Sequence, residues 1–357
     1  MASSTNAPTT TKNVSGNTAK PKIPLYEAAT QFRNWRFSVD GLAKLRASMN
    51  QVAVDAIRKK IEADQPGSSE TVSFLTPNEE VLLVKLYLTK ITQLCTMFRF
   101  PEEIEATATS YLKRFYLRNT VMDWHPKNVM LTALFLATKT CNFPISLETY
   151  TKHIPRTQPS DVLDLEFLVA QSLSFEFTVW HAHRALWGIW LDVQSLPDAP
   201  VQLQPDLYNA ALGHVRASRL TDAEFIYTPS QIALAAFSME VPEIATRWAE
   251  SKNSEEHKIN LTLSEEIKSL ILADGKPPNV DAVREADRRL KLCKNPEKVP
   301  GSKAFLAKKA EEEREAAEKR NKKAAQVQQA LNDGDPFGND VDKPRNGLVD
   351  YDDDDDD

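Results

Sequence analysis

Residues 125–143 read HPKNVMLTALFLATKTCNF, and this stretch decides the fold. Pro126 suits the first position of a helix, because its fixed backbone angle is helical and its missing N–H would have no partner there. Apolar and small residues fill the following turns, and Ala133 and Ala137 lie four apart on one face. Small residues let neighbouring helices approach closely. We therefore expect a central helix that other helices surround.

Four further helices are expected around this central one between residues 76 and 178. Thr76-Pro-Asn-Glu79 has the spacing of a capping box, in which each of the two side chains accepts a backbone N–H of the other residue. Acidic residues open the next helix and basic residues close it, as the helix dipole favours. The five expected helices begin near Thr76, Glu102, His125, Ser146 and Ser160.

The same order of helices is expected a second time after residue 178. Thr228-Pro-Ser-Gln231 is another capping box, and its Pro229 lies 103 residues after Pro126. The other expected helices lie at 179–193, 207–220 and 242–249, and after Thr262, which has the capping-box spacing to Glu265. Two sets of five helices in one order indicate a tandem repeat.

The predicted fold is all-α, with two tandem five-helix domains, extra N- and C-terminal helices and disordered tails. Its parts are a mostly disordered segment (1–37), an N-terminal helix (38–63), the two domains (74–178 and 179–276), a C-terminal helix (279–295) and a charged tail (296–357). Within the tail, residues 303–331 have almost no apolar stripe, which suits a solvated single helix or a disordered segment. The Asp-rich end, 350–357, is expected to be disordered because it has almost nothing to bury.

The composition excludes several classes of protein. Only 10 glycines against 21 prolines argue against glycine-rich phosphate loops and favour helices punctuated by prolines. The three cysteines are scattered, so neither a disulfide framework nor a zinc site is expected. No secretory signal is found, and the apolar runs are too short to span a bilayer. We expect a nuclear or cytosolic protein that binds no membrane, metal or cofactor.

The net charge of −6 comes from the C-terminus. Residues 334–357 hold ten Asp against one Lys and one Arg, a local charge of −8, which leaves +2 for residues 1–333. A body this close to neutral lacks the basic excess of proteins that grip a phosphate backbone, so direct binding to nucleic acid is not expected. KRNKK at 319–323 is either a nuclear localisation element or part of a charged helix.

Two charged residues stand out because apolar residues surround them at helical spacing. Lys139 follows Phe135 and Leu136 by one turn, and Glu166 has apolar residues on both neighbouring turns. A charge in such surroundings must reach water, pair with an opposite charge or shift its pKa. Lys139 can extend into water near a helix C-terminus, and Glu166 can lie at the core edge. Spacing alone does not show whether the two meet.

A resemblance to a known family favours a shared role for Lys139 and Glu166. KRFYLRNTVMDWHPKNVMLTALFLATK at 113–139 resembles a cyclin box, the helical domain of the cyclins. RNWRFSVDGLAKLRASMN at 33–50, LTDAEFIYTPSQIALAA at 220–236 and the acidic C-terminus resemble the cyclin-H subfamily, of the fungal type. The resemblance covers roughly residues 31–295, and YTPSQIAL is specific to that subfamily.

The resemblance implies a non-catalytic subunit that binds and activates a cyclin-dependent kinase (CDK). The implied complex is the CDK-activating kinase of TFIIH, which acts in the nucleus on the activation loops of other CDKs and on the C-terminal tail of RNA polymerase II. It implies a RING-containing assembly factor as a third subunit, and association with the TFIIH core. The family's kinase-binding Lys and Glu match Lys139 and Glu166, and its apolar contacts match Leu136, Ala170 and Phe175.

The chain departs from the family pattern beside these positions. Thr-Cys-Asn follows Lys139, where many cyclins have an acid or an aromatic residue, and Ala170 is smaller than the usual aliphatic residue. The departures concern the detail of the expected interface and not the pairing of Lys139 with Glu166.

The alternative from another class is a nucleic-acid-binding basal factor of the TFIIB type, which shares the tandem fold. That family has a zinc ribbon and basic repeats, and the sequence has no ribbon cysteines and a near-neutral body. A helical scaffold without a kinase is a third interpretation, and an enzyme has little support because no nucleophile–base set is found. His181 and His183 have no cysteine cluster nearby, so we interpret them as surface or interface residues.

Overall fold

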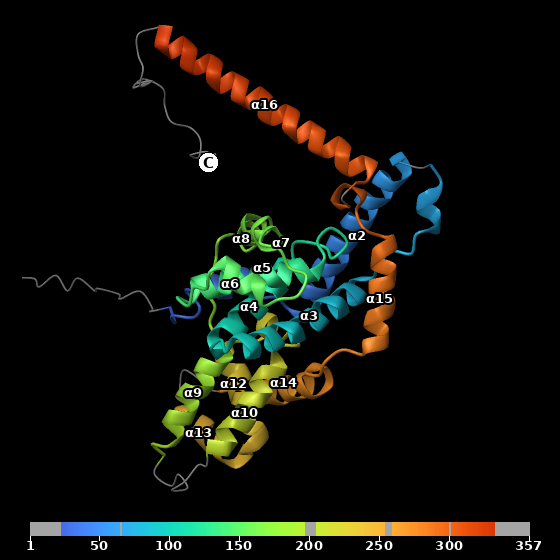
Figure 1. The fold of residues 1–357 in the computed structure, drawn as a ribbon. Helices are drawn as coiled ribbons and strands as arrows, with labels where there is room; N and C mark the ends of the chain where they lie inside the picture. The colour runs from blue at the N-terminus through green and yellow to red at the C-terminus, as the bar shows by residue number, and fades with distance from the viewer. Residues whose placement is uncertain (1–22, 65, 197–204, 254–258, 300, 333–357) are drawn as a thin grey trace, which may run out of the picture. The chain divides into compact units, whose positions relative to one another are not determined.

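The computed structural model describes residues 23–64, 66–196, 205–253, 259–299 and 301–332 (Figure 1). Within these residues the regular elements are α-helices and short 3₁₀ turns, which confirms the predicted all-α class. The chain divides into a main unit, Met1–Ala56 with Val72–Cys293, and a small unit, Ile57–Thr71 with Lys294–Asp357. The predictions for 1–22 and for the Asp-rich end lie outside the described residues.

The first helical domain of the main unit is built around α5, the helix that the sequence places at its centre. α5 (Pro126–Thr140) packs against α3 (Pro77–Phe98), α4 (Glu102–Phe115), α7 (Ser160–Leu163) and α8 (Glu166–Ser172), and α6 (Leu147–Lys152) follows it in the chain. Every residue of α5 from 129 to 138 is buried, including both small residues, Ala133 and Ala137. The small side chains thus lie where α5 meets its neighbours.

The last helix of this domain is interrupted, whereas the sequence predicts one helix from Ser160. α7 ends at Leu163, and α8 begins at Glu166. Thr132 of α5 donates its hydroxyl to the carbonyl oxygen of Val162 at 2.9 Å, and this carbonyl would otherwise accept the N–H of Glu166 in a continuous helix. The interruption makes Glu166 the first residue of α8.

The second helical domain repeats this arrangement around α12 (Pro229–Glu240). α12 packs against α9 (Ala182–Val193), α10 (Pro205–Ser218), α11 (Ala223–Ile226), α13 (Pro242–Lys252) and α14 (Leu261–Asp274). In Figure 1 these helices lie together below those of the first domain. The predicted start of α14 is wrong by two residues, because Asn260, and not Thr262, caps the helix by accepting the N–H of Thr262 at 2.9 Å.

Two of the three predicted capping boxes form, at α3 and α12, whereas Asn260 caps α14 in place of the predicted Thr262. The Thr76 hydroxyl accepts the N–H of Glu79 at 3.4 Å, and Glu79 accepts the N–H of Thr76 at 2.9 Å. At α12, the Thr228 hydroxyl accepts the N–H of Gln231 at 3.3 Å, and Gln231 accepts the N–H of Thr228 at 2.8 Å. Each box satisfies two N–H groups that the helix itself leaves unpaired.

Replacing Thr228 with alanine is expected to lower the free energy of unfolding by about 1 kcal/mol, because the cap on α12 is lost. Thr228→Ser keeps the hydroxyl and is expected to stay near the wild type. Urea denaturation of the three proteins measures both effects. Equal losses in Thr228→Ala and Thr228→Ser would show that the hydroxyl is not the source of the stabilisation.

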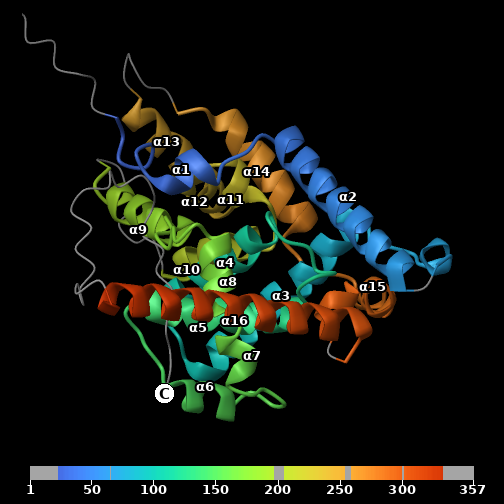
Figure 2. The same ribbon diagram turned by 90° about the horizontal axis from the view of Figure 1, so that it is seen from above.

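The N-terminal segment folds against both domains before α2 (Val39–Asp64) begins. The sequence predicts a mostly disordered segment at 1–37, but residues 30–34 form α1 (Thr30–Asn34) and Trp35 is only 1% exposed. The indole of Trp35 donates to Glu176 at 2.6 Å, and Gln31 exchanges two hydrogen bonds with the backbone of Trp180. Figure 2 shows α1 near α11 and α12. These partners lie more than 140 residues away, so local composition did not reveal them.

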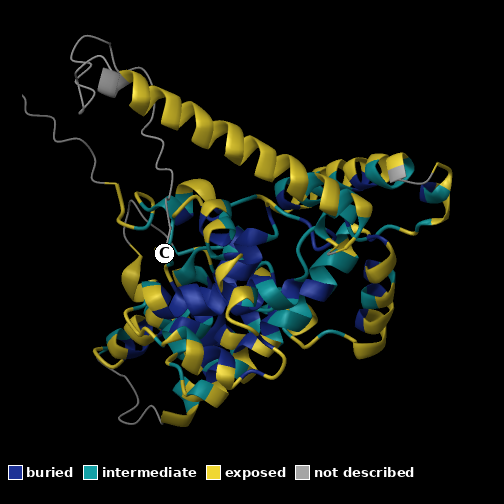
Figure 3. Cartoon of the chain, turned by 45° about the horizontal axis from the view of Figure 1, so that its top comes forward, coloured by how far each residue is buried: buried dark blue, intermediate teal, exposed yellow. Residues whose placement is uncertain are grey.

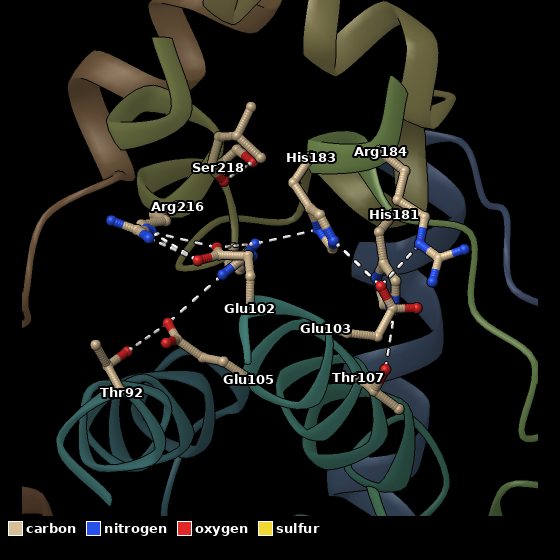
Figure 4. A network of polar contacts seen from close by, with 12 residues as sticks. Thr92, Glu102, Glu103, Glu105, Thr107, His181, His183, Arg184, Arg216 and Ser218 are labelled. Atoms are coloured by element: carbon tan, nitrogen blue, oxygen red, sulfur yellow. Dashed lines mark hydrogen bonds and ion pairs between the residues drawn. The ribbon is translucent and has the colours of Figure 1, made fainter. Parts of the chain in front are cut away.

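A network of ion pairs joins the two domains at the start of α4 (Figure 4). Glu102 binds Arg216 at 2.6 Å and Arg219 at 2.5 Å. Burial alone would raise the pKa of Glu102, but hydrogen bonds from Arg216 and the charges of Arg219 and Arg216 lower it from its ordinary 4.5 to about 2. The charged form of Glu102 is therefore the stable one in the folded chain.

His181 and His183 lie at the same domain boundary, as the interface interpretation requires. His181 is 7% exposed, and its Nε2 lies 3.0 Å from the hydroxyl of Thr107. Burial, with the charges of His183 and Arg219, lowers the pKa of His181 well below its ordinary value, so the ring is neutral at physiological pH. Among the described residues no group of three or more His, Cys, Asp or Glu side chains is placed to hold a metal ion.

Glu102→Gln is expected to lower the free energy of unfolding by at most about 3 kcal/mol at pH 7, since the pKa of Glu102 is about 2.5 units below its ordinary value. A carboxyl group with a depressed pKa stabilises the fold above its unfolded pKa. The difference between the wild type and Glu102→Gln should therefore shrink as the pH falls from about 4.5 towards about 2.

Urea titrations at several pH values measure this difference. Glu285→Gln, which removes an exposed ion pair within α15 (Val280–Leu292), is the control. It should lower the free energy of unfolding by no more than about 1 kcal/mol. If the difference in unfolding free energy between the wild type and Glu102→Gln does not change with pH, the lowered pKa of Glu102 is contradicted.

The small unit contains the end of α2, two short turns, η1 (Ser68–Thr71) and η2 (Pro296–Lys298), and α16 (Lys303–Asn332). Glu297 pairs with Lys60 of α2 at 2.8 Å and with Lys308 of α16 at 3.3 Å. Beyond its first turns α16 is exposed along its described length, as its yellow colour in Figure 3 shows. The sequence predicted either a solvated helix or a disordered segment at 303–331, and the structure shows the solvated helix.

One helix among the described residues, α3, is long and apolar enough to cross a membrane by length and composition alone. This corrects the expectation that the apolar runs are too short. In the main unit α3 packs against α4, α5 and α15, and Leu83, Leu88 and Ile91 are at most 3% exposed. Its apolar face is therefore used in the core of the first domain.

Candidate functional site

The structure brings Lys139 and Glu166 together as an ion pair, although they lie 27 residues apart. Lys139 lies in the last turn of α5, and Glu166 is the first residue of α8, which packs against α5. The interruption between α7 and α8 places Glu166 at the start of a helix that faces the end of α5. Lys139 therefore does not simply extend into water, which was the alternative that its spacing left open.

The pair is partly exposed, so it has bonding capacity left for another molecule. The side chains of Lys139 and Glu166 are 42% and 22% exposed. An ammonium group has three donors and a carboxylate has about four acceptor positions, and the pair uses only some of them. The Lys139 ammonium also lies 5.0 Å from the centre of the Phe135 ring, an attractive cation–π distance. A protein that docks here meets one fixed donor and one fixed acceptor.

The three apolar residues that the resemblance added lie on the same helices as the ion pair, or directly after them. Leu136 and Ala170 are buried, at 6% and 8% exposure, whereas Phe175 is 54% exposed. Ser174 and Phe175 both have positive φ, 54° and 57°, a left-handed conformation that non-glycine residues rarely adopt. The N–H of Phe175 bonds the carbonyl of Ala170 at 2.9 Å and ends α8. This strained turn holds the Phe175 ring at the surface.

Sequence reasoning missed an aromatic side chain beside the ion pair. Phe167, which follows Glu166, is 65% exposed, and its ring centre lies 6.1 Å from that of Phe175. Leu163, the last residue of α7, and Phe143, three residues after the end of α5, are 48% and 47% exposed. The available signal was spacing: Phe167 lies two positions from Leu165 and from Val169, which are buried, so its side chain points away from theirs. The charged pair thus lies among exposed large apolar residues, which mark binding surfaces.

Comparison with known proteins identifies the family of the two helical domains. Residues 75–178 match the profile of the cyclin N-terminal domain, and residues 181–273 match that of the cyclin C-terminal domain. Cyclin mcs2 of Schizosaccharomyces pombe is 32% identical over 298 residues, which cover 81% of this chain and 91% of that protein. The chain belongs to the cyclin family. Proteins named cyclin-H from Dictyostelium discoideum and Xenopus laevis, a putative one in the first case, are also similar to this cyclin.

Two solved structures resemble this cyclin in fold and sequence. A chain of the CAK complex of Chaetomium thermophilum bound to ATP-gamma-S is 28% identical, with a TM-score of 0.70 over 82% of this chain and 94% of that chain. A chain of the yeast TFIIK (Kin28/Ccl1/Tfb3) complex is 30% identical, with a TM-score of 0.58 over 69% of this chain and 100% of that chain. Membership of the cyclins decides against the TFIIB-type alternative.

Proposed function

We propose that this cyclin is the regulatory, non-catalytic subunit of a CDK-activating kinase of the TFIIH type. The observation that carries the proposal is the partly exposed Lys139–Glu166 ion pair, formed between the ends of two helices that pack together. Its similarity to cyclin mcs2 and to chains of the CAK and TFIIK complexes supports the same assignment.

The internal repeat indicates which domain binds the kinase. The central helices of the two domains are related by a shift of 103 residues. The positions equivalent to Lys139 and Glu166 are then Pro242 and Ser269, neither of which is charged. Since the second domain has no such pair at these positions, the kinase is expected to bind the first domain.

The proposed mechanism needs no reacting group from the cyclin. A CDK without a cyclin keeps its mobile helix turned away, so that its catalytic Lys–Glu pair is not made. A rigid surface that binds the active arrangement more tightly shifts the population of the kinase towards it. Lys139 and Glu166 would supply charge-assisted hydrogen bonds to that arrangement, and Leu136, Ala170 and Phe175 would supply apolar contact.

The remaining parts of the proposal concern the complex. Its kinase would act on the activation loops of other CDKs and on the C-terminal tail of RNA polymerase II, in the nucleus. A RING-containing assembly factor would be its third subunit, and TFIIH its larger assembly. The yeast TFIIK complex brings Kin28, Ccl1 and Tfb3 together, which supports a complex of three chains.

Affinity purification from the native organism tests the proposed function. The tagged full-length chain is expected to copurify with a CDK, which mass spectrometry identifies. That kinase, expressed and purified alone, is expected to phosphorylate a CDK activation-loop peptide only when the chain is added. Absence of a CDK from the purified material, or equal kinase activity with and without the chain, would contradict the proposal.

A further inference from the structure

Thr76 carries an exposed hydroxyl directly before a proline, at the start of α3. The sequence contains two Thr-Pro dipeptides, Thr76-Pro77 and Thr228-Pro229, and no Ser-Pro dipeptide. Proline-directed serine/threonine kinases require a proline directly after the residue that they modify. Thr76 is exposed and has an extended backbone, and residues 72–75 before it form no helix, whereas Thr228 is half-buried. Thr76 is therefore the more accessible of the two sites.

The Thr76 hydroxyl and Arg289 of α15 meet at one atom of Glu79. Oε2 of Glu79 accepts the Thr76 hydroxyl at 2.9 Å and also pairs with Nη2 of Arg289. The arginine comes from the C-terminal helix, which packs against α3 (Figure 1). An acidic group attached to the threonine oxygen would therefore take the place of the Glu79 carboxylate and meet the arginine.

Arg289 has a donor that its present partner does not use. Its Nε is buried and has no hydrogen-bond acceptor among the described residues. Nε and Nη2 lie on one edge of the guanidinium and donate in parallel, which is the arrangement that binds a carboxylate or a phosphate through two oxygens. A phosphate on threonine has three acceptor oxygens and a charge of about −1.5 to −2 at pH 7, so it can bind both donors.

The N-terminus of α3 favours the same exchange of partners. The first N–H groups of a helix and its dipole attract an anion. At present the Thr76 hydroxyl accepts the N–H of Glu79 at 3.4 Å, a long hydrogen bond that a charged acceptor would improve. A phosphate would repel the Glu79 carboxylate, and this side chain is 29% exposed and can turn into water. Arg289 would then exchange a partner of charge −1 for a more strongly charged one.

We propose that Thr76 is a phosphorylation site for a proline-directed serine/threonine kinase, and that Arg289 binds the phosphate. The transfer breaks the bond between the γ-phosphorus of ATP and its bridging oxygen, forms a bond from that phosphorus to Oγ1 of Thr76, and releases ADP and the hydroxyl proton. The phosphate then ties the start of α3 to α15 and so fixes the C-terminal helix on the first domain. This inference goes beyond the proposed function and does not depend on it.

Treatment of the folded full-length chain with an active mitogen-activated protein kinase and ATP tests access to the site. Mass spectrometry of the digested chain is expected to find phosphate at Thr76, and more of it than at Thr228. Thr228 is the matched internal control, because it also caps a helix before a proline but is less exposed and has the neutral Gln231 in place of Glu79. If a peptide of residues 70–84 is phosphorylated at Thr76 and the folded chain is not, the site is refuted.

The melting temperature tests whether Arg289 binds the phosphate. Phosphorylation is expected to raise it by about 2–4 °C in the wild type and to leave it unchanged in Arg289→Gln. Arg289→Lys keeps the charge but loses the two-donor edge, so a smaller rise is expected, and this variant serves if Arg289→Gln does not fold. Thr76→Ala treated in the same way is the control for phosphate at other positions and should not change. A fall in the wild type, or an equal rise in the wild type and both Arg289 variants, would overturn the role of Arg289.

Discussion

Lys139→Ala is expected to weaken binding of the CDK by roughly 30- to 5,000-fold, which corresponds to about 2–5 kcal/mol. Much of this loss comes from Glu166, which would be covered by the kinase without its cation. A charge that is removed from water and left unpaired costs more than the pair itself contributes. The free chain should fold normally, because the Lys139 side chain is 42% exposed.

The measurement is the Kd of the purified chain for its copurifying CDK, together with the melting temperature of the chain alone. Lys252→Ala is a matched control: Lys252 also ends a helix, is also 42% exposed and pairs with Asp192 at 2.6 Å, but belongs to the second domain. Its Kd should equal that of the wild type. If Lys139→Ala and Lys252→Ala weaken kinase binding equally, binding depends on the net charge of the chain and not on the position of Lys139.

Trp35→Ala is expected to lower the free energy of unfolding by roughly 3–5 kcal/mol, the range for removing a large buried aromatic side chain. Trp35 is 1% exposed, donates to Glu176 and carries Arg114 and Arg118 against its ring, with ring-centre distances of 5.0 and 4.7 Å. Its removal leaves a cavity and takes a donor from Glu176. The expected fall in melting temperature is on the order of 10 °C.

Trp187→Ala is the control for this substitution. Trp187 is 49% exposed on α9, so its removal should lower the free energy of unfolding much less. Thermal and urea denaturation of the three proteins give the comparison. A Trp35→Ala protein as stable as the wild type would show that the N-terminal segment does not contribute to the folded main unit in solution.

Local features of the fold were predictable from the sequence. Pro126 and the two threonine capping boxes mark helix starts, because capping depends on residues at most four positions apart. The burial of α5 on all sides was predictable for the same reason, since its apolar and small residues occur on every face of the helix. The distinct chemistry of Lys139 and Glu166 was also visible, because a charge among apolar neighbours needs a partner or water.

The sequence by itself determined where most of the helices start, which of them is central in each domain, and that two charges stand among apolar residues. Only the tertiary structure decided that Lys139 meets Glu166, that Trp35 is buried, and that Phe167 and Phe175 stand together at the surface. The physical reason is range. Helix starts and stripes depend on neighbours within about one turn, whereas these contacts depend on how separate helices pack, and the bond from Thr132 to Val162 that interrupts the last helix of the first domain spans 30 residues.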